Sequence, residues 1–208
     1  MSSKSVFVNA LTFLRVPLIF TWLVCAVVQA YTGGFWLAFV ACAAMGLSGL
    51  TDLFDGALAR KWDVVTPLGQ MADPLMDKVF YVVAFPGLCW LVMHQGVSEV
   101  HALAMLAFTV LYILRDLWVT FMRSVGSMFG ANVAAMWLGK VRTALSFPTA
   151  GWIYGYVLLH DQVPAPWGDA WLVSCYAIEA AMIALNVVSF VTYTRSYMPY
   201  LKKALERK

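Results

Sequence analysis

The sequence predicts an all-α integral membrane protein: a bundle of six transmembrane helices preceded by an N-terminal interfacial segment. Hydrophobic residues make up 62% of the 208 residues, charged residues only 12%, and the mean hydropathy is +0.76. A soluble domain carries about 25% charged residues. The apolar residues also gather in long runs, each of which approaches the ~20 residues that a helix needs to cross a bilayer.

The apolar runs follow one another through short polar connections. Residues 1–9 are polar and are expected to lie at the membrane interface, and the mixed stretch 123–137 could form an interfacial helix. No polar linker divides the chain, so we expect residues 1–208 to form a single domain. The predicted spans are Leu11–Ala30, Phe35–Leu58, Leu68–Met93, Ala102–Met122, Leu138–Leu159 and Trp171–Thr194.

The distribution of basic residues predicts the orientation of these spans. The chain has 14 Lys and Arg residues, and none of them lies in the connections 31–34, 94–100 and 160–169. Because cytoplasmic connections are enriched in Lys and Arg, both termini and the connection between the second and third spans should face the cytoplasm. The net charge of +3 is therefore interpreted as topology and attraction to anionic lipids, not as nucleic-acid binding.

Four carboxylates lie between the second and third apolar runs, at Asp52, Asp55, Asp73 and Asp77. The members of each pair are three or four residues apart, so on a helix each pair falls on one face. Small residues accompany them, and small residues let a ligand lie against the backbone. Clustered carboxylates call for cations, and hard oxygen ligands suit Mg²⁺ or Mn²⁺.

This stretch resembles the signature of the CDP-alcohol phosphotransferases. The resemblance rests on eight residues that match at every spacing: Asp52, Asp55, Gly56, Ala59, Arg60, Gly69, Asp73 and Asp77. It implies an integral membrane enzyme that moves a phosphatidyl or similar phosphoryl group from a CDP-linked donor to an alcohol and releases CMP. It also implies a homodimer, located in a bacterial inner membrane with the active site facing the cytoplasm.

The resemblance also implies residue roles. Two divalent ions, Mg²⁺ or Mn²⁺, would be held by Asp52, Asp55, Asp73 and Asp77, and Asp77 would be the catalytic general base. The CDP-linked donor would contact Asp52, Gly56, Ala59, Arg60 and Gly69. The three histidines are expected on or near the non-cytoplasmic side, away from the aspartates, so the carboxylates must perform the acid–base chemistry.

Residues outside the signature resemble the phosphatidylglycerophosphate synthase branch of the family, whose acceptor is glycerol 3-phosphate. A dianionic acceptor needs several cations, and arginine offers bidentate contacts to phosphate oxygens. The candidate acceptor-phosphate residues are Arg115, Arg123, Lys140 and Arg142. The branch resemblance extends to Asn9, Thr12, Arg15 and Pro17 near the N-terminus and to Ser189 and Tyr193 in the last span.

Several alternatives stay open from the sequence. Asp116 stands where the synthase branch usually has Glu, and Arg-Asp at this place is also seen in cardiolipin synthases, which use phosphatidylglycerol as acceptor. The cations, Arg15 and Lys78 included, could instead snorkel to the cytoplasmic interface. Outside this family, an ion-coupled transporter or an intramembrane aspartyl protease would also place carboxylates in apolar helices.

Overall fold

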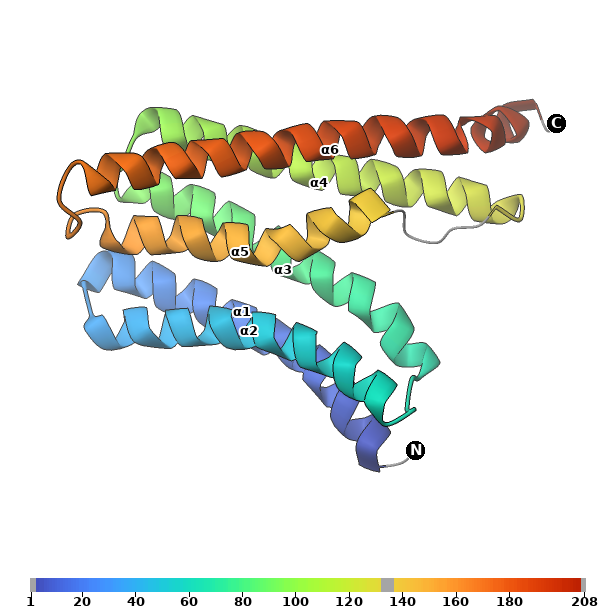
Figure 1. Cartoon of the computed structure of the whole chain (residues 1–208), viewed down its shortest axis with the longest axis horizontal. Helices are drawn as coiled ribbons and strands as arrows, with labels where there is room; N and C mark the ends of the chain where they lie inside the picture. Colours follow the sequence, from blue (N-terminus) through green and yellow to red (C-terminus); the bar gives the residue numbers. More distant parts are fainter. Residues whose placement is uncertain (1–2, 132–136, 207–208) are drawn as a thin grey trace. The chain divides into compact units, whose positions relative to one another are not determined.

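The protein was analysed as a computed structural model, which describes residues 3–131 and 137–206. These residues form long helices, as the sequence predicts. Five of the helices, α1, α2, α3, α4 and α6, are long and apolar enough to cross a membrane, which makes the chain an integral membrane protein. The helices are α1 (Ser3–Thr32), α2 (Phe35–Lys61), α3 (Pro67–His94), α4 (Glu99–Met128), α5 (Trp137–Leu159) and α6 (Trp167–Glu206) (Figure 1).

Helix α5 is not among the five candidate spans. Its 23 residues are long enough to cross a bilayer, but it carries Lys140 and Arg142 near its start and Pro148 inside it. Glycine, threonine, tyrosine and tryptophan dilute its apolar content further. The sixth predicted span therefore stays a prediction.

Every helix extends beyond its predicted apolar span, and α1, α4 and α6 do so by the most residues. Residues 3–9 form the first turns of α1, so the predicted N-terminal interfacial segment is continuous with the first span. Helix α4 continues to Met128, and the rest of the predicted interfacial helix lies partly outside the described residues. Helix α6 continues past Thr194 to Glu206, and its 40 residues correspond to about 60 Å at 1.5 Å per residue.

The chain forms two compact units, and each is described by itself. The first contains Met1–Ala102 and Ala150–Val163, and the second contains Leu103–Thr149 and Pro164–Lys208. Helices α4 and α5 contribute residues to both units. The first unit holds the aspartates of the signature, and the second holds the candidate acceptor cations.

In the first unit, α1 packs along α2 and against α3 (Figure 1). Trp22 of α1 is fully buried, and its ring meets the edge of Tyr154 at a centroid distance of 5.6 Å. A Cβ on Gly87 of α3 would lie 2.8 Å from Leu23 and 3.2 Å from Trp22. A glycine is needed there because α1 and α3 approach one another too closely for a side chain.

In the second unit, α4 and α6 pack through aromatic side chains. Val119 and Met122 of α4 form a buried cluster with Tyr193 and Tyr197 of α6. A Cβ on Gly126 of α4 would lie 2.5 Å from the Tyr197 ring, so the two helices meet closely at this glycine. The Trp118 indole donates a hydrogen bond to the Thr194 hydroxyl at 2.8 Å and joins the same two helices.

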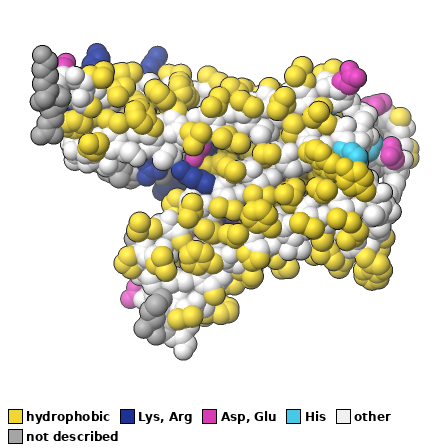
Figure 2. Space-filling view, turned by 180° about the vertical axis from the view of Figure 1, so that it is seen from behind, with side chains coloured by type: hydrophobic (Ala, Val, Ile, Leu, Met, Phe, Trp, Pro, Cys, Tyr) yellow, Lys and Arg dark blue, Asp and Glu magenta, His cyan; other side chains and the backbone are white. Residues whose placement is uncertain are grey.

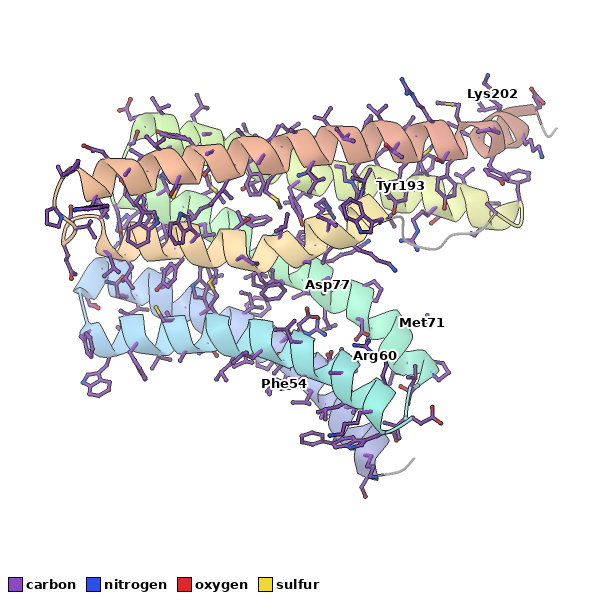
Figure 3. All side chains as sticks on the ribbon, viewed as in Figure 1. Phe54, Arg60, Met71, Asp77, Tyr193 and Lys202 are labelled. Carbon is purple, nitrogen blue, oxygen red and sulfur yellow. The ribbon has the colours of Figure 1, made fainter. Side chains whose placement is uncertain are left out.

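The surface is largely apolar (Figure 2). Large side chains such as Trp36 and Phe54 are 75% and 55% exposed, and Phe54 points outward from α2 (Figure 3). Exposed apolar area on this scale would be a liability in water. It is expected of helices that contact lipid.

Candidate active site

The four signature carboxylates meet around one guanidinium group. Helix α2 supplies Asp52 and Asp55, α3 supplies Asp73 and Asp77 (Figure 3), and α1 supplies Arg15. The Arg15 Nη1 lies 2.6 Å from an oxygen of Asp52 and 3.1 Å from one of Asp77. Its Nη2 lies 2.5 Å from an oxygen of Asp55 and 3.9 Å from one of Asp73. Helix packing thus brings together carboxylates that are separated by a turn and a loop in sequence.

The four carboxylates differ in how firmly they are held. The Asp55 side chain is only 4% exposed, and Thr12 donates a second hydrogen bond to its Oδ2 at 2.9 Å. The Asp73 side chain is 49% exposed and makes the longest contact with Arg15. Asp55 is therefore the fixed member of the cluster, and Asp73 is the member most open to an approaching cation or ligand.

A pocket adjoins the carboxylates within the first unit. Asp55 and Asp73 line it, together with the three small residues predicted to lie against the donor. It also takes in side chains of α1 and of the connection between α2 and α3. Its lining residues are Val8, Asn9, Thr12, Asp55, Gly56, Ala59, Val64, Val65, Thr66, Gly69 and Asp73.

Arg60 lies close to this pocket at the end of α2. Its side chain extends toward the start of α3 (Figure 3). The guanidinium Nη1 lies 3.4 Å from the position that a Cβ on Gly56 would occupy. Gly56 and Arg60, predicted from the resemblance to bind the donor, are therefore neighbours one helical turn apart.

A hydrogen-bonded chain fixes the start of α3. The Gly69 N–H donates to the Thr66 hydroxyl at 3.0 Å and caps the helix, and Pro67 occupies the first turn. Because the Thr66 oxygen accepts that bond, its own proton is free to donate to the Asn9 Oδ1, at 3.0 Å. The Asn9 amide is oriented as a result, and its buried Nδ2 has no hydrogen-bond partner within residues 3–131 and 137–206.

Thr66 was not predicted from the sequence to belong to the site. A Cβ on Gly69 would lie 3.1 Å from the Thr66 hydroxyl oxygen and 3.3 Å from the Asn9 Oδ1. Gly69 thus makes room for this pair of polar side chains. A threonine directly before a proline at a helix start is a capping signal, and it could have indicated Thr66.

Two of the candidate acceptor cations are buried inside the second unit. Arg142 donates to Asp116 Oδ1 at 2.8 Å and to Asn186 Oδ1 at 3.2 Å. Its guanidinium also lies 4.0 Å from the ring centroid of Tyr112, a cation–π contact. These contacts join α4, α5 and α6. Asn186 and Tyr112 were not predicted, although a polar Asn in an apolar span is itself a functional signal.

Arg115 shares the carboxylate of Arg142. It lies 3.7 Å from Asp116 Oδ1, donates a hydrogen bond to the Ser189 hydroxyl, and stands 5.1 Å from the ring centroid of Tyr193. Tyr193 projects from α6 toward α5 (Figure 3), where a Cβ on Gly139 would meet its hydroxyl oxygen at 3.0 Å. Ser189 and Tyr193, noted from the branch resemblance, thus belong to this cluster.

The other two candidate acceptor cations differ in exposure. Arg123 is partly buried in α4, and Lys140 is exposed near the start of α5. The candidate acceptor residues therefore separate into a buried pair fixed by hydrogen bonds and a more accessible pair.

The carboxylates have the chemistry to hold divalent ions. Four carboxylates carry more negative charge than one guanidinium neutralises, and Mg²⁺ and Mn²⁺ prefer such hard oxygen ligands. Over the described ranges, no group of three or more Asp, Glu, His or Cys residues is arranged as a metal site, and the four aspartates contact Arg15. The four aspartates are therefore suitable ligands for Mg²⁺ or Mn²⁺, and in the structure their side chains are arranged around Arg15.

Apolar helices long enough to span a membrane and a carboxylate-lined pocket are the features expected of a membrane-embedded enzyme of the class that the signature indicates. The family model for CDP-alcohol phosphatidyltransferases matches residues 6–192. The chain belongs to this family, as the signature indicated, and it has CDP-alcohol phosphatidyltransferase activity. Family membership implies CDP-diacylglycerol as a substrate and the use of a divalent metal ion. Membership in this family favours an enzyme of this class over an ion-coupled transporter or an intramembrane aspartyl protease.

Curated relatives resemble one branch of the family. The chain is 28% identical to CDP-diacylglycerol–glycerol-3-phosphate 3-phosphatidyltransferase of Escherichia coli strain K12 over 171 residues, which cover 81% of this chain and 80% of the relative. It is also 28% identical to the protein of the same name from Salmonella choleraesuis strain SC-B67, over 180 residues that cover 86% and 85% of the two chains.

Proposed function

We propose that the protein transfers the phosphatidyl group of CDP-diacylglycerol to glycerol 3-phosphate, which yields phosphatidylglycerophosphate and CMP. One observation supports this acceptor: Arg115 and Arg142 share the single Asp116 oxygen. Two guanidinium groups beside one carboxylate place positive charge inside an apolar helical unit, and ionisable residues in such an environment are usually functional. A phosphate dianion is a suitable partner for that charge.

The donor would bind in the pocket of the first unit. Gly56, Ala59 and Gly69 would let the nucleotide approach the backbone, and Asp52 and Arg60 would contact it near the pyrophosphate. The Asn9 Nδ2, which has no hydrogen-bond partner in the part of the chain that the structure describes, offers a donor to an acceptor atom of the nucleotide. The acyl chains would remain in lipid, against the apolar surface of the helices.

Asp52, Asp55, Asp73 and Asp77 would hold the two divalent ions. When bound, the ions neutralise charge on the donor phosphates and on the departing CMP. Asp77 would accept the proton of the acceptor hydroxyl as its oxygen bonds to the β-phosphorus, while the bond from that phosphorus to CMP breaks. Its side chain is 27% exposed, so the carboxylate is accessible to the acceptor hydroxyl.

The basic residues support an active site on the cytoplasmic side of a bacterial inner membrane, with both termini on that side. A homodimer is proposed from the family resemblance. The cytoplasmic orientation agrees with a soluble acceptor delivered from the cytosol.

The acceptor is tested by CMP release from purified protein with each alcohol offered separately. We expect turnover with glycerol 3-phosphate. Turnover with phosphatidylglycerol alone would support the cardiolipin synthase alternative, which Asp116 favours, and would leave the reaction class standing.

The residues of the acceptor site are tested with Lys140→Ala, because Lys140 is exposed and its loss should not disturb packing. A charge-assisted hydrogen bond is worth about 1.5–3 kcal/mol, so the KM for glycerol 3-phosphate should rise about ten- to a hundredfold. The KM for CDP-diacylglycerol should change little. Lys203→Ala, on the exposed end of α6, is the matched control. Equal effects on both substrates would indicate that Lys140 only snorkels.

A further inference from the structure

Arg15 makes contacts that the sequence analysis did not predict for it. It lies on α1 and is only 2% exposed, so its position differs from that of a cation that snorkels to the interface. One oxygen of each of the four signature aspartates lies within 4 Å of its terminal nitrogens. One buried cation therefore holds the whole carboxylate cluster.

The four contacts follow a regular pattern. Nη1 lies between Asp52 of α2 and Asp77 of α3, and Nη2 lies between Asp55 of α2 and Asp73 of α3. Each terminal nitrogen thus joins one carboxylate from each helix. The rigid, planar guanidinium presents two positive positions, each at the meeting point of two carboxylates.

The charges of this cluster depend on one another. A buried arginine without a partner is costly in an apolar environment, and several carboxylates close together cannot all remain ionised without a cation. Arg15 supplies that cation in the absence of metal ions. Ions that bind to the same oxygens must therefore compete with its guanidinium.

We propose that Arg15 is the counter-ion of the metal-free active site and that divalent ions displace its guanidinium from the carboxylates when they bind. This inference rests on the proposed role of the aspartates as metal ligands. In the metal-free protein, Arg15 keeps α1, α2 and α3 together at the site. It also weakens metal binding, because each ion must replace existing ion pairs.

Two variants test this role on the full-length protein, purified and stripped of metal with a chelator. Arg15→Met removes the charge and keeps most of the side-chain length. Arg15→Lys keeps a positive charge, but its single ammonium group can replace only one of the two terminal nitrogens of the guanidinium. Arg195→Met, at an exposed position of α6, is the matched control. Isothermal titration measures the Kd for Mn²⁺, and thermal unfolding is followed with chelator and with Mn²⁺.

We expect Arg15→Met to have a lower Tm than the wild type in chelator and to recover most of the difference in Mn²⁺. Its Kd for Mn²⁺ should be at least about tenfold lower than that of the wild type. The ions no longer have to replace the hydrogen bonds of Arg15, and one charge-assisted hydrogen bond corresponds to about that factor. Arg15→Lys should be intermediate in both measurements. Folding of Arg15→Met only in the presence of Mn²⁺ would also support the inference. In that case, the Kd for Mn²⁺ is compared between Arg15→Lys and the wild type.

A weaker Kd in both Arg15 variants would overturn the inference, because Arg15 would then support the metal ligands and not compete with the ions. If neither the wild type nor the variants bind Mn²⁺, the assignment of the aspartates as metal ligands is wrong, and this inference fails with it. A Tm in chelator that is unchanged in both variants would also contradict the counter-ion role.

Discussion

At the scale of single residues, Gly69 shows how a signature glycine can serve the protein's own side chains. Its missing Cβ leaves space for the Thr66 hydroxyl and the Asn9 amide. Gly69→Ala should therefore disturb the cap of α3, and the loss of a cap costs about 1 kcal/mol. It should also weaken CMP binding, because Thr66 would no longer orient Asn9. Thermal unfolding and CMP titration measure the two effects.

The control for this prediction is Gly46→Ala in α2. A Cβ at Gly46 would meet nothing within 4 Å, so the change should stabilise the helix by about 0.5–1 kcal/mol. If Gly69→Ala behaves like Gly46→Ala in both measurements, the steric account of Gly69 is wrong.

Asp77 is the residue whose role is most directly testable. If it is the general base, Asp77→Asn should remove turnover, since an amide cannot accept the hydroxyl proton. Metal-dependent binding of CDP-diacylglycerol should remain measurable, because three carboxylates stay in place. CMP release and donor titration in Mn²⁺ distinguish the two properties. Loss of donor binding together with residual turnover would contradict the assignment.

Residue spacing and family resemblance predict that Asp52, Asp55, Asp73 and Asp77 belong to one site, and their roles there stay a prediction. The structure brings the four side chains together around Arg15, a contact that the sequence did not indicate. The role of Arg15 could not be predicted from spacing, because its partners Asp55 and Asp77 lie 40 and 62 residues further along the chain. Contacts over such separations depend on how helices pack, and no local pattern encodes that.

At the scale of elements, Asp116 connects the helices of the second unit. It accepts a hydrogen bond from Arg142 of α5 and also lies near Arg115 of α4. Asp116→Asn would remove the carboxylate that lies between two buried guanidinium groups, and breaking a buried ion pair typically costs about 3–5 kcal/mol. We expect a large drop in Tm. The double variant Asp116→Asn/Arg142→Gln should recover part of it, whereas no recovery would show that the pair is not coupled.

Hydropathy predicted where the helices lie better than where they end. Each predicted span falls inside one helix, because long apolar runs form helices in a membrane. The helix ends depend on the backbone instead. Helix α4 ends shortly before Gly130, whose φ is 71°, and α6 continues through polar residues to Glu206. Apolar residues become fewer where a helix leaves the membrane, but the hydrogen-bonded helical backbone continues beyond that point.

At the scale of the whole molecule, the predicted topology can be tested by cysteine labelling. In a background without the four native cysteines, Lys61→Cys should react only from the cytoplasmic side and Gln162→Cys only from the opposite side. Both positions are exposed, and Lys61 avoids the neighbouring Asp63, whose φ of 52° disfavours most side chains. Labelling of both positions from the same side would contradict the orientation.

The division into two compact units could not be predicted from the sequence. The absence of a polar linker suggested one domain over residues 1–208, and that remains a prediction. Two of the three unit boundaries run through α4 and α5, after Ala102 and Thr149, and the third follows Val163 in the connection between α5 and α6. A boundary inside a helix leaves no compositional signal, since the apolar pattern continues across it.

The contact between Arg15 and Asp77 has a consequence for how the chain is made. The ribosome adds Asp77 62 residues after Arg15. At about 5–20 residues per second, this interval lasts roughly 3–12 s. During this time the set of carboxylates around Arg15 is incomplete, because Asp55 follows it by 40 residues and Asp77 by 62, so the first helix must keep that charge in contact with water or lipid headgroups. The first helix to be synthesised can therefore reach its final depth only after the second and third helices have entered the membrane.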